Sequence, residues 1–161
     1  MYFKHRLIIK EKNHIQKIGK KGNNVKKRIK LLFLIIWMLV IFFFSHQPHS
    51  NKVTHSLIET ILPSLKSSNY LDIINFSIRK LAHIAEYFIL SFLTISLLKE
   101  YTKNERIIIF STIIFCFLYA CSDELHQLFI AGRTSKFGDV IIDTIGSIIN
   151  IIIYKVNKKG Y

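Results

Sequence analysis

The sequence predicts an all-α, polytopic membrane protein with four transmembrane helices, and two observations support this prediction. Half of the 161 residues are hydrophobic, yet the chain carries a formal net charge of +13. The apolar residues are gathered into four long blocks, at 31–44, 81–98, 107–122 and 140–154, instead of alternating with polar ones. Four helices that are apolar all round would leave a soluble bundle almost no polar face toward water. We therefore expect the blocks to cross a bilayer.

The first block, Leu31 to Phe44, is uncharged and follows a basic segment. A cleaved signal peptide is the alternative interpretation of this block. A retained helix is favoured because the preceding segment is long and no small-x-small cleavage site follows. After this block, apolar residues repeat at helical spacing from Val53 to Leu62, which predicts an interfacial helix on the outer leaflet.

The second block, Leu81 to Leu98, contains two ionisable residues, His83 and Glu86, near its first turns. We expect Leu71 to Arg79 to extend this helix outward. Like the other blocks, it is shorter than the ~20 residues that span hydrocarbon. Flanking Lys, Arg and Tyr side chains can extend each block, because their stems lie in the apolar zone while their heads reach water.

The third and fourth blocks, Ile107 to Ser122 and Val140 to Tyr154, contain a single charged residue, Asp143. Both cysteines, Cys116 and Cys121, lie in the third block. Residues five apart on a helix point in different directions, so the sequence predicts no disulfide.

Lys and Arg are distributed unevenly among the segments outside the blocks. The first thirty residues contain eleven of them and one acid, and three more occur in each of the middle loop and the tail. With four helices, the termini and the middle loop share one side, which the positive-inside bias makes cytoplasmic. We expect that side to carry only basic anchors. The expected organisation is a basic cytoplasmic segment at 1–28, a four-helix membrane domain at 29–156 and a cytoplasmic tail at 157–161.

The basic N-terminal segment is explained by topology and by attraction to anionic lipid, at ~1 kcal/mol per basic residue near the surface. Nucleic-acid binding is the alternative for such a run. Nothing else in the chain resembles a nucleic-acid-binding fold. We therefore expect membrane lipids, and no nucleic acid, as partners.

Ionisable residues inside membrane segments are costly and are functional candidates by default. In the predicted topology they gather at the outer ends of the helices. At 100° per residue, one polar face forms on each of the last three helices. These faces contain Arg79, His83 and Glu86; then Tyr119, Asp123 and Gln127, with Glu124 and His126 to either side; then Asp139, Asp143, Gly146 and Asn150. We expect these faces to point toward one another. The carboxylates of Glu86, Asp123, Asp139 and Asp143 would then meet the basic side chains of Arg79, Arg133, His83 and His126.

The residues alone leave several uses of such a site open. One is an ion-pair network that fixes the helices, since buried charges must pair. Another is an enzymatic site with a carboxylate or His as acid or base, in which Arg79 or Arg133 holds an anionic group such as a lipid phosphate. A binding or conduction site is a third. Metal binding by His83, Glu86, Asp123 and His126 is a weakly signalled variant, and we expect no metal and no cofactor.

In combination these motifs resemble the VanZ-like family of small membrane proteins. The resemblance rests on SHQP after the first block, K-x-x-H-x-x-E-Y from Lys80 to Tyr87, D-E-x-H-Q from Asp123 to Gln127, Arg133 six residues later, and Asp139, Asp143 and Gly146 in the fourth block. It extends from about Ile29 to Tyr154. The long basic N-terminal extension is not part of this pattern.

The resemblance implies a multi-pass protein of the bacterial plasma membrane and, by association, low-level resistance to teicoplanin-type glycopeptide antibiotics. It implies no mechanism. We expect an extracytoplasmic polar site that binds or acts on an envelope component, such as a cell-wall precursor or a surface lipid. The alternatives are a membrane-embedded hydrolase or transferase acting on a lipid or phosphate-bearing headgroup, and a non-catalytic protein with a buried ion-pair network. The candidate catalytic residues are His83, Glu86, Asp123, Glu124, His126 and Asp143, and the candidate substrate-binding residues are Arg79, Lys80, Tyr87, Gln127, Arg133 and Asp139.

Overall fold

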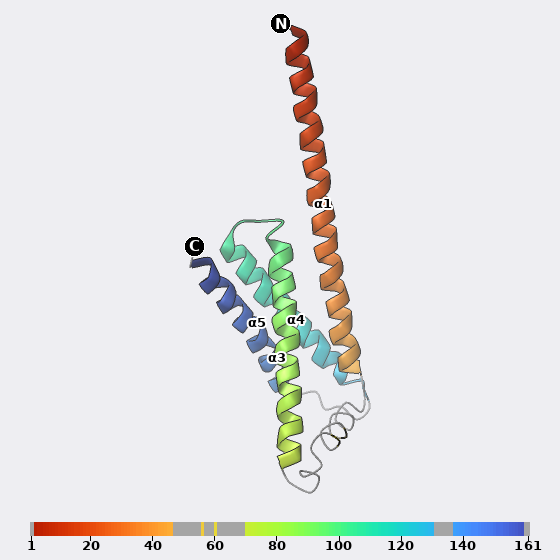
Figure 1. Cartoon of the computed structure of the whole chain (residues 1–161). Helices are drawn as coiled ribbons and strands as arrows, with labels where there is room; N and C mark the ends of the chain where they lie inside the picture. The colour runs from red at the N-terminus through yellow and green to blue at the C-terminus, as the bar shows by residue number, and fades with distance from the viewer. Residues whose placement is uncertain (1, 47–55, 57–59, 61–69, 131–136, 160–161) are drawn as a thin grey trace.

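The computed structural model describes residues 2–46, Ser56, Thr60, 70–130 and 137–159, with side chains in the first helix from Gly22 onward. Its helices are α1 (Tyr2–His46), α3 (Tyr70–Leu98), α4 (Glu105–Gln127) and α5 (Phe137–Lys159) (Figure 1). Each contains a stretch long and apolar enough to cross a membrane, and the described residues contain no strand. The prediction of an all-α protein with four transmembrane helices is confirmed.

The helices extend beyond the apolar blocks from which they were predicted. α3 begins at Tyr70, so the expected outward extension of this helix is present. α1 continues without interruption from the basic segment into the apolar block. The predicted interfacial helix at 53–62 falls almost entirely outside the described residues.

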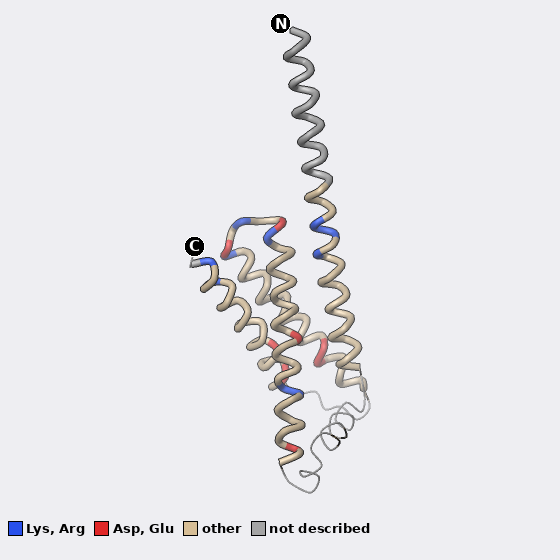
Figure 2. The backbone as a smooth tube through the Cα atoms, in the orientation of Figure 1, with Lys and Arg blue, Asp and Glu red and all other residues tan. Residues whose placement is uncertain are grey.

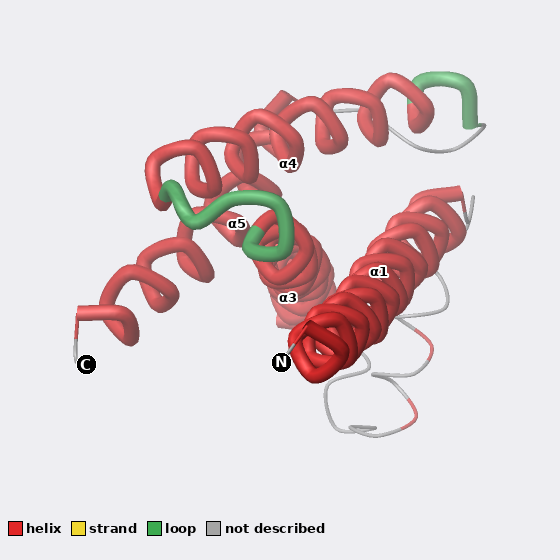
Figure 3. Tube along the Cα trace, turned by 90° about the horizontal axis from the view of Figure 1, so that it is seen from above, coloured by secondary structure: helices red, strands yellow, loops and turns green. Residues whose placement is uncertain are grey.

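α3 lies centrally in the bundle and contacts each of the other three helices (Figure 3). A buried core joins all four; it comprises Leu34, Ile41, Tyr87, Leu90, Cys116, Ala120 and Val140. The outward faces are strongly apolar, as shown by Phe43 and Phe110, which are 66% and 67% exposed. Large apolar side chains on the outside of a helical bundle are suited to contact with lipid.

α3 and α5 approach each other closely at Gly146. A Cβ atom placed on Gly146 would lie 2.4 Å from the carbonyl oxygen of Ile84 and 3.0 Å from its Cα. One turn further along, Asn150 donates to Ser91 Oγ (3.0 Å), and Ser91 donates to the carbonyl of Ser147 (3.2 Å). Small and hydroxyl-bearing residues at a helix interface allow close packing in a bilayer, where no hydrophobic force joins the helices.

The middle of α1, the loop between α3 and α4 and the end of α5 lie at one end of the bundle, and α1 continues beyond this end toward the N-terminus (Figure 1). Lys and Arg of the described residues gather there (Figure 2). We call this the basic end. The shared position agrees with the expected topology, whereas the side of the membrane that it faces stays a prediction.

The prediction that this end carries only basic anchors is wrong, because two acids there join neighbouring elements. Lys30 of α1 lies 2.5 Å from Glu100, and Lys158 of α5 lies 2.8 Å from Glu105 of α4. The hydrogen bond from Lys30 lowers the pKa of Glu100 from its ordinary value. The prediction rested on the Lys and Arg residues of this end and did not take Glu100 and Glu105 into account.

Candidate functional site

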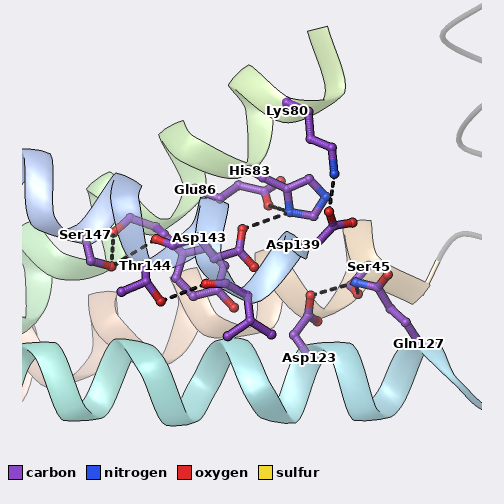
Figure 4. Close-up of polar contacts among 12 residues, drawn as sticks. Ser45, Lys80, His83, Glu86, Asp123, Gln127, Asp139, Asp143, Thr144 and Ser147 are labelled. Carbon is purple, nitrogen blue, oxygen red and sulfur yellow. Dashed lines mark hydrogen bonds and ion pairs between the residues drawn. The ribbon is translucent and has the colours of Figure 1, made fainter. Parts of the chain in front are cut away.

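Polar side chains from all four helices meet inside the bundle, away from the basic end (Figure 4). They are Ser45 of α1; Lys80, His83 and Glu86 of α3; Asp123 and Gln127 of α4; and Asp139 and Asp143 of α5. We call this set the polar cluster. The three helix faces that the sequence marked as polar thus come together, and α1 contributes a residue that the sequence analysis did not include.

His83 and Asp143 join α3 to α5 in the polar cluster. His83 Nδ1 lies 3.2 Å from Asp143 Oδ1 and 4.0 Å from Glu86 Oε2 (Figure 4). The Asp143 side chain is completely buried, whereas those of His83 and Glu86 are 14% and 20% exposed. A buried carboxylate must be compensated by a nearby positive charge or hydrogen-bond donor. His83 is placed to provide it.

The close approach of the two helix backbones explains why these side chains meet. Ile84, whose carbonyl approaches Gly146, is next to His83, and Gly146 lies one turn beyond Asp143. Trp37 Nε1 of α1 donates to the carbonyl oxygen of Glu86 at 2.9 Å. Trp37 therefore packs within the bundle and joins α1 to α3.

A second ion pair links α3 to α5 nearer the ends of these helices. Lys80 Nζ contacts Asp139 Oδ1, and both side chains are largely buried. Arg79 was expected to meet the carboxylates, but it is Lys80 that reaches Asp139. Successive helical residues point about 100° apart, so a polar face predicted from sequence does not decide between neighbours. Arg79 is half-buried.

Gln127 connects α4 to α1. Its amide nitrogen donates to Ser45 Oγ at 2.8 Å and to Asp123 Oδ2 at 3.0 Å. All three residues are at most 5% exposed. Ser45 was not predicted as a site residue, although it begins the SHQP motif that contributed to the family resemblance.

His126, expected to meet a carboxylate, instead has its described contacts with α1. Its Nε2 atom lies 3.1 Å from Nδ1 of His46, and its ring centroid lies 4.6 Å from that of Phe42. His46 also belongs to the SHQP motif and was not predicted as a site residue. His126 is therefore positioned by α1, at the edge of the polar cluster.

Two further predicted residues are buried nearby. Glu124 is 4% exposed on α4. Tyr87 is fully buried on α3, and its hydroxyl has no hydrogen-bond partner among the described residues. A buried hydroxyl without a partner is unfavourable and marks a position where a water or a ligand group could bind. Arg133, the remaining predicted residue, lies outside the described part of the chain.

The model of the VanZ/LLP1 family matches residues 30–158. The chain belongs to the VanZ/LLP1 family. The resemblance expected from the sequence motifs is thus confirmed, and the protein is a multi-pass membrane protein of this family. Searches of curated proteins and of solved structures found no significant match. The matched stretch includes every residue of the polar cluster, so the cluster is part of the VanZ/LLP1 region.

The polar cluster gives this VanZ/LLP1 protein groups suited to proton exchange and to holding a charged headgroup. A His beside carboxylates can donate or accept a proton, and a Lys can bind an anion. Within the described residues, no group of three or more His, Cys, Asp and Glu is arranged to hold a metal ion.

Proposed function

We propose that the protein lies in the bacterial plasma membrane with its basic end in the cytoplasm and its polar cluster toward the outer leaflet. The concentration of Lys and Arg at one end supports this orientation through the positive-inside bias. Residues 1–28 and 157–161 are then cytoplasmic, and 29–156 form the membrane domain. Attraction to anionic headgroups holds the basic segment against the inner surface.

In this orientation, the polar cluster binds or acts on an envelope component, a surface lipid or a cell-wall precursor, and thereby lowers the action of teicoplanin-type antibiotics. The antibiotic role comes from the family resemblance. The observation that carries the site is the fully buried Asp143 carboxylate against His83. Buried ion pairs contribute little net stability, and ionisable groups inside a membrane are functional candidates for that reason.

Expression in a teicoplanin-susceptible host tests this role. The wild-type chain is expected to raise the inhibitory concentration of teicoplanin, and Asp143→Asn is expected to return it to the empty-vector value. Glu105→Gln, which removes a carboxylate at the basic end, is the matched control and should protect like wild type. The amount of each variant in the membrane is measured alongside. No protection by the wild-type chain rejects the antibiotic role, and full protection by Asp143→Asn rejects the polar cluster as its site.

A membrane-embedded hydrolase or transferase is the second candidate, and the geometry of His83 favours it. Asp143 contacts Nδ1 of the ring, and a carboxylate at that atom leaves Nε2 to exchange a proton with a bound substrate. Purified protein incubated with envelope lipids should then yield a product of altered mass. Asp143→Asn and Glu86→Gln should bind the lipid but form no product. Binding without turnover by the wild-type protein would reject the enzyme and keep the binding role.

The third possibility, a purely structural ion-pair network, makes the opposite prediction for paired apolar substitutions. Replacing a buried ion pair by well-packed apolar residues is often neutral or stabilising. A His83→Leu/Asp143→Leu double variant that folds and still protects the host would support a structural role. A folded double variant that has lost protection would support the functional ones.

A further inference from the structure

Two adjoining hollows lie at the basic end, between the start of α4 and the end of α5. The first, about 530 Å³, is lined by Asn104, Glu105, Arg106, Ile109 and Lys155. The second, about 520 Å³, is lined by Arg106, Lys155 and the apolar residues Ile107, Ile109, Phe110 and Ile113. Because the hollows share Arg106, Ile109 and Lys155, they form one continuous feature, which we call the α4–α5 groove.

The end of the α4–α5 groove nearest the loop is cationic. Glu105 forms an ion pair with Lys158 at 2.8 Å, which offsets its negative charge. Arg106 and Lys155 are both exposed and line the groove from opposite helices. An anion bound there would meet a guanidinium and an ammonium group, the two side-chain groups that pair most effectively with phosphate.

The other end of the groove is apolar and lies deeper in the bilayer. The 23 residues of α4 span about 35 Å, close to the ~30 Å of a hydrocarbon core. Arg106, the second residue of α4, is therefore at the membrane surface. Ile109 and Ile113 lie about one and two turns further in. A soluble anion would use only the cationic end, whereas a phospholipid would occupy both.

We propose that the α4–α5 groove binds an anionic phospholipid, with the phosphate between Arg106 and Lys155 and an acyl chain along Ile109 and Ile113. Basic pockets between transmembrane helices recognise such headgroups through the same combination of charge and position. The groove is at the opposite end of the bundle from the polar cluster. This site therefore does not depend on the function proposed for that cluster.

Lipid titration of the full chain in a neutral detergent, followed by native mass spectrometry, tests the proposal. The wild-type protein is expected to bind phosphatidylglycerol more tightly than phosphatidylcholine. Arg106→Gln/Lys155→Gln should lower the affinity for phosphatidylglycerol about 20- to 30-fold, because each basic residue contributes about a fivefold factor. Lys99→Gln/Lys103→Gln removes two exposed charges of the loop between α3 and α4 at the same end and should leave the affinity unchanged.

Three outcomes would overturn the proposal. Equal losses in the two double variants would mean that net charge, and not the groove, attracts the lipid. Displacement of the lipid by glycerol 3-phosphate at similar concentrations would mean that the site takes a soluble anion. Unchanged binding in Ile113→Trp, which fills the apolar part, would mean that no acyl chain lies there. The Ile113→Trp variant keeps both charges, so it also tests the groove if the double variant does not fold. Arg106→Lys/Lys155→Arg keeps a positive charge at both positions and should bind like wild type.

Discussion

Among the described residues, ion pairs join different elements both in the polar cluster and at the basic end, but in very different surroundings. At the basic end, the paired side chains of Lys30, Glu100, Lys158 and Glu105 are 21–50% exposed. In the polar cluster, those of Lys80, Asp139, His83 and Asp143 are 0–19% exposed. Water can replace a lost partner at the basic end, whereas in the polar cluster a charge without a partner stays in a medium of low dielectric constant. Removing one partner of a pair therefore costs more stability in the polar cluster than at the basic end.

Gly146→Ala should have the largest effect, because it acts on the backbone contact that makes the polar cluster possible. The new Cβ would lie 2.4 Å from the Ile84 carbonyl oxygen, so α3 and α5 would have to separate. We expect a loss of about 3 kcal/mol in unfolding free energy, at the upper end for overpacking. Reversible unfolding in mixed micelles with added sodium dodecyl sulfate measures it. Gly138→Ala is the matched control on the same helix, since a Cβ there meets nothing within 4 Å. Equal stability of the two variants would mean that the helices do not need this close approach.

Asp143→Ala should have the next largest effect. It removes the buried partner of His83, whose side chain is itself 14% exposed and can be partly solvated. We expect a loss of about 2 kcal/mol, below the usual range for breaking a buried ion pair, because of this partial exposure. A double-mutant cycle with His83→Ala measures the coupling between the two residues. Additive losses in the cycle would show that the pair does not act as a unit.

Ser45→Ala should have a smaller effect, because it removes one hydrogen bond and leaves Gln127 bonded to Asp123. Hydrogen bonds between membrane helices contribute about 0.6 kcal/mol on average. The same unfolding assay should therefore show a loss of this order. Ser77→Ala is a suitable control, since the Ser77 hydroxyl bonds within its own helix, to the carbonyl of Ile73. A loss above about 2 kcal/mol would show that α1 depends on this contact far more than one hydrogen bond allows.

Glu100→Gln should have the smallest effect on the free energy of unfolding, and this effect should depend on pH. The pKa of Glu100 is lower in the folded protein than in the unfolded chain because of the hydrogen bond from Lys30. Its contribution to stability is therefore present above the unfolded pKa, about 4.3, and is lost as the pH falls through the lower folded value. The small difference in unfolding free energy between wild type and Glu100→Gln should disappear on acidification. A difference that grows at low pH would contradict this sign.

Local sequence pattern was sufficient to predict the helices and the polar faces of α3, α4 and α5. Apolar runs identify a membrane helix regardless of its neighbours, and helical periodicity places His83 and Glu86 on one face. The outward extension of α3 was predicted to within one residue, although Asn75, Ser77 and Arg79 interrupt the apolar pattern where the helix begins.

Contacts between helices were only partly predictable. Whether Arg79 or Lys80 reaches Asp139 depends on how α3 is rotated against α5, which the sequence of either helix does not contain. Ser45 and His46 were missed because an isolated Ser or His at a helix end carries no signal by itself. The functional use of the candidate residues stays a prediction.

The length of α3 has a consequence for the depth of the polar cluster in the bilayer. His83 is fifteen residues from Leu98, the end of α3 at the basic end. Fifteen residues correspond to about 22 Å along the helix, in a hydrocarbon core of about 30 Å. The His83–Asp143 pair is thus about 8 Å from the opposite boundary, and Lys80 is nearly at it. About 8 Å of hydrocarbon separates the pair from the membrane surface near Lys80, and about 22 Å separates it from the surface at the basic end. Protons and headgroups would therefore reach the pair from the side of Lys80.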